Sequence, residues 1–247
     1  MKVAAYQAPL LIAGSMCALD LIREQVAWCE AENVSVLCCP EAILGGLADY
    51  GDNPSAFAVR IDTGQLASVL TPLASSRVTC IVGFTELACY GEFYNAVVVF
   101  HRGQVQGVYR KIHPAIRRSV YAPGQEVPVF HACQLTFGVL ICNDSNDPGL
   151  ARCMAAQGAG VIFIPTNNGL PNQRASLELN AAARTVDAAL AIENRIWVIR
   201  ADVAGRNGTL TSLGCSEIVN PNGDVVQEGR LEEWDLLVAE INLAKAV

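Results

Sequence analysis

Apolar and polar segments alternate along this chain in lengths that are typical of strands and helices. Short apolar runs predict buried strands, and longer stretches with apolar residues at helical spacing predict helices. The predicted strands are residues 3–7, 34–39, 78–84, 96–100, 135–142, 161–165, 197–201, 212–219, 224–226 and 236–241. The predicted helices are residues 17–31, 63–75, 147–157 and 173–194.

This order of strands and helices predicts an α/β fold. Several strands are apolar on both faces, so both faces of their sheets must be covered. Residues 103–107, with two glycines, and residues 221–224, with the sequence PNGD, are typical of hairpin turns. We find no Ser/Gly-rich linker, repeat or low-complexity tract, and therefore expect a single domain over residues 1–247.

Composition excludes several classes of function. Apolar residues make up 52% of the 247 residues and charged residues 17%, and the net charge is −7. Scattered basic residues in an acidic chain argue against nucleic-acid binding. No segment reaches the ~20 consecutive apolar residues of a membrane span, and we interpret residues 3–16 as beginning with a core strand, not as an export signal.

The cysteines and histidines do not have the spacing of a metal site. There are ten cysteines and three histidines, with no Cys-x-x-Cys pair. The cysteines are spread through apolar elements, where free cysteines act as small hydrophobic side chains. We expect all cysteines but Cys142 to be core residues, no metal site, and a reducing cytoplasmic location.

Cys142 differs because it ends the apolar run 135–142 and precedes the polar segment NDSNDP. A thiol at a strand-to-helix corner is held where it can face a cleft. Glu41 follows the run 34–39 in the same way, and Lys111 follows the hairpin after residues 96–100. An acid, an amine and a thiol at the ends of core elements indicate covalent acyl chemistry.

Each of the three has a chemical task in that hypothesis. Glu41 would remove the thiol proton, because only the thiolate attacks a carbonyl or nitrile carbon. Lys111 and the backbone N–H of Asn143 would stabilise the oxyanion. The alternative interpretations are that Cys142 is an ordinary core cysteine, that Glu41 is a carboxylate at a helix start, and that Lys111 is a solvated lysine.

Three further residues are candidates for substrate contacts. Asn167 and Asn168 follow the strand 161–165, and ligands bind at strand ends in open α/β folds. Arg117 is placed to bind a substrate carboxylate through two hydrogen bonds. The alternative for all three is an ordinary polar loop.

Several segments together resemble the nitrilase superfamily, the carbon-nitrogen hydrolases. The resemblance rests on motifs that occur in the family's order over nearly the whole chain. They are residues 40–46 (PEAILGG), 109–113 (YRKIH), 122–124 (APG), 138–144 (GVLICND), 191–194 (AIEN) and 218–223 (IVNPNG).

The resemblance implies a four-layer αββα sandwich of two mixed sheets flanked by helices, assembled as a homodimer or a higher homo-oligomer. It also implies hydrolysis of a nonpeptide C–N bond in a small molecule, without metal or cofactor. The matching motifs place the family's catalytic triad at Glu41, Lys111 and Cys142, with a thioester intermediate.

Two departures refine this expectation. Arg117 stands where many amidases of the family have a second glutamate, and Asn143 stands where true nitrilases tend to have tryptophan. We therefore expect an amidase or N-carbamoyl hydrolase that releases ammonia or an amine. A nitrilase proper and a non-catalytic binding protein of the same fold are the alternatives.

Overall fold

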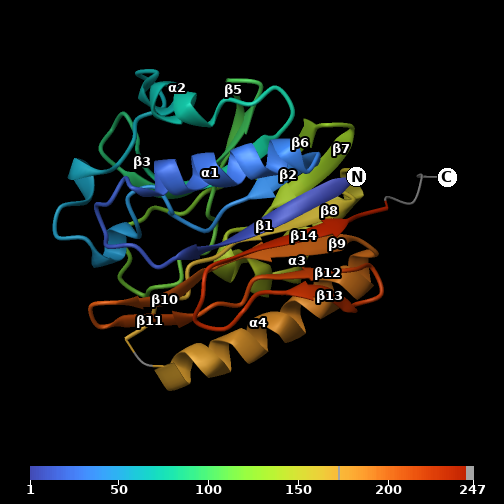
Figure 1. Ribbon diagram of the computed structural model, residues 1–247. Helices are drawn as coiled ribbons and strands as arrows, with labels where there is room; N and C mark the ends of the chain where they lie inside the picture. The colour runs from blue at the N-terminus through green and yellow to red at the C-terminus, as the bar shows by residue number, and fades with distance from the viewer. Residues whose placement is uncertain (172, 243–247) are drawn as a thin grey trace.

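Two β-sheets pack face to face, and helices cover their outer faces (Figure 1). The computed structural model describes residues 1–171 and 173–242, without the side chains of 173–175. Helix α1 (Ala18–Ala31) and helix α4 (Gln173–Asn194) lie on opposite outer sides of the pair of sheets (Figure 1). This arrangement confirms the predicted four-layer α/β sandwich.

The first sheet has the strand order β11-β10-β1-β2-β3-β4-β5, and β14 also pairs with β1. Strands β1, β2 and β3 are parallel, whereas β3, β4 and β5 form an antiparallel meander. Its strands are β1 Lys2–Pro9, β2 Val34–Cys38, β3 Thr79–Leu87, β4 Phe93–His101, β5 Gln104–Arg110, β10 Val203–Asn207, β11 Leu210–Leu213 and β14 Asp235–Glu240.

The second sheet has the order β13-β12-β9-β8-β7-β6, with β7, β8 and β9 parallel. Its strands are β6 Val129–Ala132, β7 Leu135–Val139, β8 Val161–Pro165, β9 Trp197–Ala201, β12 Glu217–Val219 and β13 Val225–Glu228. The remaining helices are α2 Gln65–Leu70 and α3 Pro148–Ala156, and the 3₁₀ helices are η1 Ala48–Tyr50, η2 Pro54–Ala56, η3 Thr71–Leu73 and η4 Cys142–Asn146.

Strand β1 shows why its sequence is apolar at nearly every position. Val3 and Ala5 belong to the core between the two sheets, whereas Ala4 and Tyr6 belong to the core beneath α1. Successive side chains of a strand point to opposite faces, so a strand covered on both sides needs apolar residues throughout.

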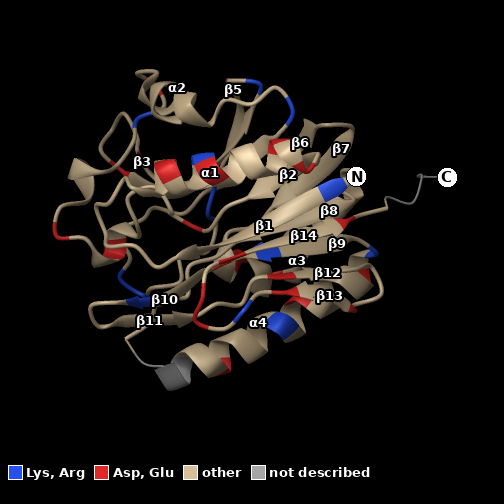
Figure 2. Cartoon of the chain, in the orientation of Figure 1, with Lys and Arg blue, Asp and Glu red and all other residues tan. Residues whose placement is uncertain are grey.

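Lys and Arg are interspersed with Asp and Glu in the view of Figure 2.

Three predicted elements differ from the structure, and some strands were not predicted. The predicted strand 135–142 ends at Val139, because the chain turns sharply at Cys142, which has a φ of 47°. The predicted helix 63–75 is α2 followed by η3, since Pro72 lacks the N–H that a continuing α-helix needs. Strands β6 and β10 were not predicted, and β5 was predicted only as the second arm of a hairpin.

The predicted strand 212–219 is in fact two strands in different sheets. β11 ends at Leu213 and β12 begins at Glu217, with Gly214 at a φ of 78° between them. A Cβ on Gly214 would lie 2.5 Å from the side-chain oxygen of Gln7, so this crossing requires glycine. An apolar run therefore did not reveal where the chain leaves one sheet for the other.

The prediction that nine cysteines are core residues is wrong for three of them. Cys17, Cys89 and Cys153 are exposed, because they precede α1, follow β3 and lie on the outer face of α3. All ten cysteines are free thiols.

Candidate active site

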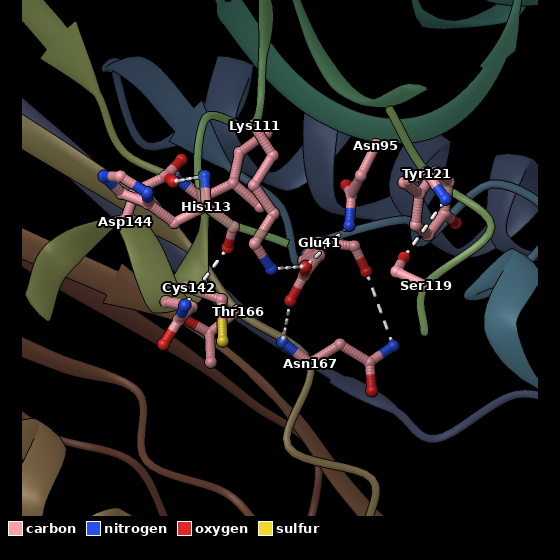
Figure 3. A network of polar contacts seen from close by, with 12 residues as sticks. Glu41, Asn95, Lys111, His113, Ser119, Tyr121, Cys142, Asp144, Thr166 and Asn167 are labelled. Carbon is pink, nitrogen blue, oxygen red and sulfur yellow. Dashed lines mark hydrogen bonds and ion pairs between the residues drawn. The ribbon is translucent and has the colours of Figure 1, made fainter. Parts of the chain in front are cut away.

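The structure brings together the three side chains that the sequence placed at element ends. Glu41 follows β2 and Lys111 follows β5 in the first sheet, and Cys142 follows β7 in the second. Figure 3 shows Glu41 and Lys111 facing each other, with the Cys142 sulfur beside them. The Glu41 and Lys111 side chains are 2% and 4% exposed, whereas Cys142 is half-buried.

The Glu41 carboxylate is fixed by three donors. The Lys111 Nζ donates to its Oε1 at 2.5 Å, and Asn95 Nδ2 donates to the same oxygen at 2.7 Å. The backbone N–H of Asn167 donates to Oε2 at 3.0 Å (Figure 3). With both oxygens engaged, this carboxylate has one defined orientation.

The loop that carries Glu41 lies directly against strand β3. Gly83 makes this approach possible, because a Cβ there would lie 2.4 Å from the Ala42 nitrogen and 2.5 Å from the Pro40 oxygen. Ala42 itself has a φ of 46°. Such positions are costly for residues with a side chain and persist only where their surroundings impose them.

Lys111 is held by its backbone on both sides. Its N–H donates to the Asn95 carbonyl at 2.8 Å, and its carbonyl accepts from the Gly124 N–H at 2.7 Å. Burial by itself lowers the pKa of the ammonium, but the carboxylate of Glu41 and the neighbouring Cys142 outweigh it, so the net pKa is raised. Lys111 is therefore a permanent cation of the site.

Cys142 begins helix η4 in the left-handed region of backbone conformation. Asp144 secures the turn, because its carboxylate accepts from Ile141 N at 3.1 Å, Tyr109 Oη at 2.8 Å and His113 N at 2.7 Å. The Ser145 hydroxyl donates to the Cys142 carbonyl at 2.8 Å. These bonds hold the strained corner that presents the thiol.

The charge balance around Cys142 keeps its thiol protonated at neutral pH. Burial and the Glu41 carboxylate raise the thiol pKa to about 12, although Lys111 and Arg200 oppose them. A thiol in this state needs a base at the moment of attack. Glu41 is the carboxylate that acts most strongly on it.

A cavity of about 310 Å³ opens onto these side chains. Its size suits a small molecule. The apolar part of its wall includes Leu47, Tyr50, Ile116, Leu170 and Leu179, and the polar part includes Glu41, Asp49, Asn95, Lys111, Ser119, Tyr121, Cys142, Asn143, Ser145, Asn146, Asn167, Asn168 and Arg200. A second cavity of about 360 Å³ lies beside Tyr94 and Arg110 and contains none of the three.

The predicted substrate contacts lie in different places. Asn167 and Asn168 line the cavity, and the Cys142 thiol donates to Asn168 Oδ1 at 3.9 Å. Asn143 also lines it, but its side-chain amide donates to the His113 carbonyl at 3.1 Å. Arg117 is exposed and is not among the lining residues, although Ile116 and Ser119 of the same loop are.

Sequence reasoning missed Asn95, Tyr121, Ser145 and Arg200. Asn95 and Arg200 had a usable signal, because each is a polar residue inside an otherwise apolar strand, β4 and β9 respectively. A buried polar side chain needs partners, and such partners often belong to a site. Tyr121 and Ser145 lie in polar loop sequence and had no such signal.

Two other kinds of site are absent from the part of the chain that the structure describes. No group of three or more His, Cys, Asp or Glu side chains there has the arrangement of a metal site. Among the described residues, no helix is both long enough and apolar enough to cross a membrane.

Comparison with known proteins places this chain in a family. A nitrilase from Pyrococcus abyssi is 32% identical over 189 residues, which are 75% of this chain and 68% of the relative. An N-carbamoylputrescine amidase from Oryza sativa subsp. japonica is 30% identical over 181 residues, 68% of this chain and 60% of the relative.

A solved structure has the same fold. An amidase of the nitrilase superfamily from Nesterenkonia, solved as a cysteine-to-alanine mutant, superposes with a TM-score of 0.78 at 22% identity, covering 98% of this chain and 90% of that one. The carbon-nitrogen hydrolase profile matches residues 2–247. The chain therefore belongs to the carbon-nitrogen hydrolase family, within the nitrilase superfamily, and is a hydrolase of that class.

Proposed function

We propose that this hydrolase cleaves the C–N bond of a small amide or N-carbamoyl compound through a thioester on Cys142. The observation that carries the proposal is the contact of one fixed carboxylate, Glu41, with a permanent cation, Lys111, beside a protonated thiol. This set supplies a base, an oxyanion partner and a nucleophile at one cavity.

The first half of the reaction forms the thioester. Glu41 takes the thiol proton as the Cys142 sulfur bonds to the carbonyl carbon. The oxyanion is stabilised by the Lys111 ammonium and the Asn143 N–H. When the oxyanion collapses, the C–N bond breaks and the proton on Glu41 passes to the leaving nitrogen, which departs as ammonia or an amine.

The second half releases the acid. A water molecule donates a proton to Glu41 as its oxygen attacks the thioester carbon. The C–S bond then breaks, and the proton returns from Glu41 to the Cys142 sulfur. The product is a carboxylic acid, or a carbamic acid from a carbamoyl substrate.

Asn167 and Asn168 are proposed to contact substrate, because both line the cavity next to the thiol. An N-carbamoylputrescine amidase among the relatives supports an amide-type substrate. The volume of the cavity, about 310 Å³, suits a small molecule. The two buried cations that line the cavity are each paired with a carboxylate of the protein, Lys111 with Glu41 and Arg200 with Asp187.

The experiment compares wild type with Cys142→Ala on a panel of small amides, ureido compounds and nitriles. Ammonia release and intact mass are recorded for each. Turnover of an amide or carbamoyl compound that disappears in Cys142→Ala, with a matching acyl adduct in the wild type, supports the proposal. Acid formed from nitriles but not amides would instead indicate a nitrilase.

A non-catalytic binding protein is the remaining alternative. It would show no turnover, and Cys142 would not be acylated by activated esters. Because Cys17, Cys89 and Cys153 are exposed, the labelled site must be identified in peptides. A Cys17→Ser/Cys89→Ser/Cys153→Ser background gives a cleaner measurement.

Two wider features are also proposals. The ten free thiols support a reducing compartment such as the cytoplasm. The exposed apolar side chains Leu177, Leu179 and Ile192 of α4, together with Val225 and Val226 of β13, support a homo-oligomer. Light scattering that finds a monomer would contradict the oligomer.

A further inference from the structure

Arg200 is a buried charge at the floor of the cavity. It lies on β9, and its side chain is 2% exposed. Its guanidinium donates from Nε to Asp187 Oδ2 at 2.6 Å and from Nη2 to Oδ1 at 2.5 Å. This two-point contact with a fully buried carboxylate of α4 fixes the plane of the guanidinium.

The other bonds of the guanidinium reach two active-site loops. Nη2 donates to the Ser145 hydroxyl at 3.2 Å, and Ser145 in turn donates to the Cys142 carbonyl at 2.8 Å. Nη1 donates to the Thr166 hydroxyl at 2.8 Å. The Thr166 carbonyl accepts the Glu41 N–H at 3.2 Å. Ser145 therefore links Arg200 to Cys142, and Thr166 links Arg200 to Glu41.

The charge of Arg200 also acts on the thiol directly. Arg200 lines the same cavity as Cys142, and its positive charge favours the thiolate, against burial and the Glu41 carboxylate. Lys111 is the other cation that favours the thiolate. Both cations are paired with carboxylates, Lys111 with Glu41 and Arg200 with Asp187.

We propose that Arg200 is a positioning residue of this hydrolase. It fixes the turn at Cys142 relative to the loop that carries Glu41, and it supplies a second positive charge near the thiol. The proposal rests on the proposed function. A buried ion pair that serves packing alone contributes little to stability and is replaceable by apolar residues. Such a pair needs neither the Ser145 nor the Thr166 hydroxyl, both of which Arg200 binds.

The test measures Cys142 alkylation by iodoacetamide in peptides between pH 7 and pH 10, together with kcat and KM. Arg200→Met removes the charge and is expected to slow alkylation at pH 8 about tenfold. This is the loss of thiolate that follows when the thiol pKa rises by about one unit. Arg200→Lys keeps the charge but cannot make all three contacts, so it should restore most of the alkylation rate but not kcat. Ser145→Ala should lower kcat on the order of fivefold, the effect of one hydrogen bond.

Arg184→Met is the matched control. Arg184 lies on α4, pairs with Glu228 and is not among the residues that line the cavity, so its loss should leave both readouts unchanged. Wild-type alkylation and kcat in folded Arg200→Met would overturn the proposal. If Arg200→Met does not fold, unchanged kcat in both Arg200→Lys and Ser145→Ala would overturn it.

The alkylation readout needs no substrate. If the wild type hydrolyses nothing, the proposed function fails, while the pH dependence of alkylation still decides whether Arg200 acts on the thiol.

Discussion

Glu217 carries a buried carboxyl group whose titration is predicted to lower the stability of the fold as pH rises from 4.5 to about 8. It lies on β12 beside Arg200, and its side chain is 1% exposed. Within the described part of the chain, neither of its carboxyl oxygens receives a hydrogen bond. Burial and the neighbouring Asp187 raise its pKa to about 8, although Arg200 and Arg184 oppose them. Glu228 is its partner on β13.

The direction of the effect follows from proton binding. The folded protein holds the Glu217 proton more tightly than the unfolded chain, where the pKa is 4.5. Stability from this group is therefore complete below pH 4.5 and is lost as pH rises through about 8. Since a difference of one in pKa corresponds to about 1.4 kcal/mol, the loss is on the order of a few kcal/mol.

Glu217→Gln removes the titration and keeps the shape of the side chain. Urea unfolding of both proteins from pH 4.5 to pH 9 gives the free energy of unfolding at each pH. We expect the variant to gain stability relative to the wild type as pH rises, by a few kcal/mol at pH 9. The difference between the two curves reports the titration of Glu217 together with that of Asp187, which it faces, because the remaining titrating groups are shared.

Glu92→Gln serves as the control, because it removes an exposed carboxylate that lies between β3 and β4, outside the strands next to Glu217. Its curve should run parallel to that of the wild type. If the Glu217→Gln curve is also parallel to the wild-type curve, with only a constant offset, the assignment of a raised pKa to Glu217 is refuted.

Three further predictions concern the active site. Lys111→Ala should lower kcat/KM for ammonia release a hundredfold or more, because it removes an oxyanion partner. A tenfold loss or less would contradict that role. Substitution of the exposed Lys2 by alanine is the control. Glu41→Gln should abolish hydrolysis yet speed Cys142 alkylation at pH 8, because the Glu41 charge raises the thiol pKa; slower alkylation would contradict this. Gly83→Ala should reduce both activity and Tm, because the new Cβ would clash with the backbone of Ala42 and Pro40. Wild-type kinetics would show that the loop carrying Glu41 shifts without loss of activity.

The site could be located from sequence because catalytic side chains follow recognisable apolar runs. Cys142 ends such a run, Glu41 and Lys111 follow core elements, and the ordered motifs pointed to the same three residues. Asn95 and Arg200 were not found, because a polar residue inside a strand acquires its role from partners distant in sequence. Arg117 was selected by its position relative to a motif, but it is exposed and is not among the residues that line the cavity.

By itself, the sequence determined the α/β class, most of the strands and the loops that bear the three reactive side chains, because hydrophobic periodicity is a local property. Only the tertiary structure decided which sheet each strand joins, as at Gly214, and where an apolar run bends, as at Cys142. It alone also decided which charges pair in the interior, as with Arg200 and Asp187. These features depend on contacts between segments far apart in the chain, and local patterns do not encode such contacts.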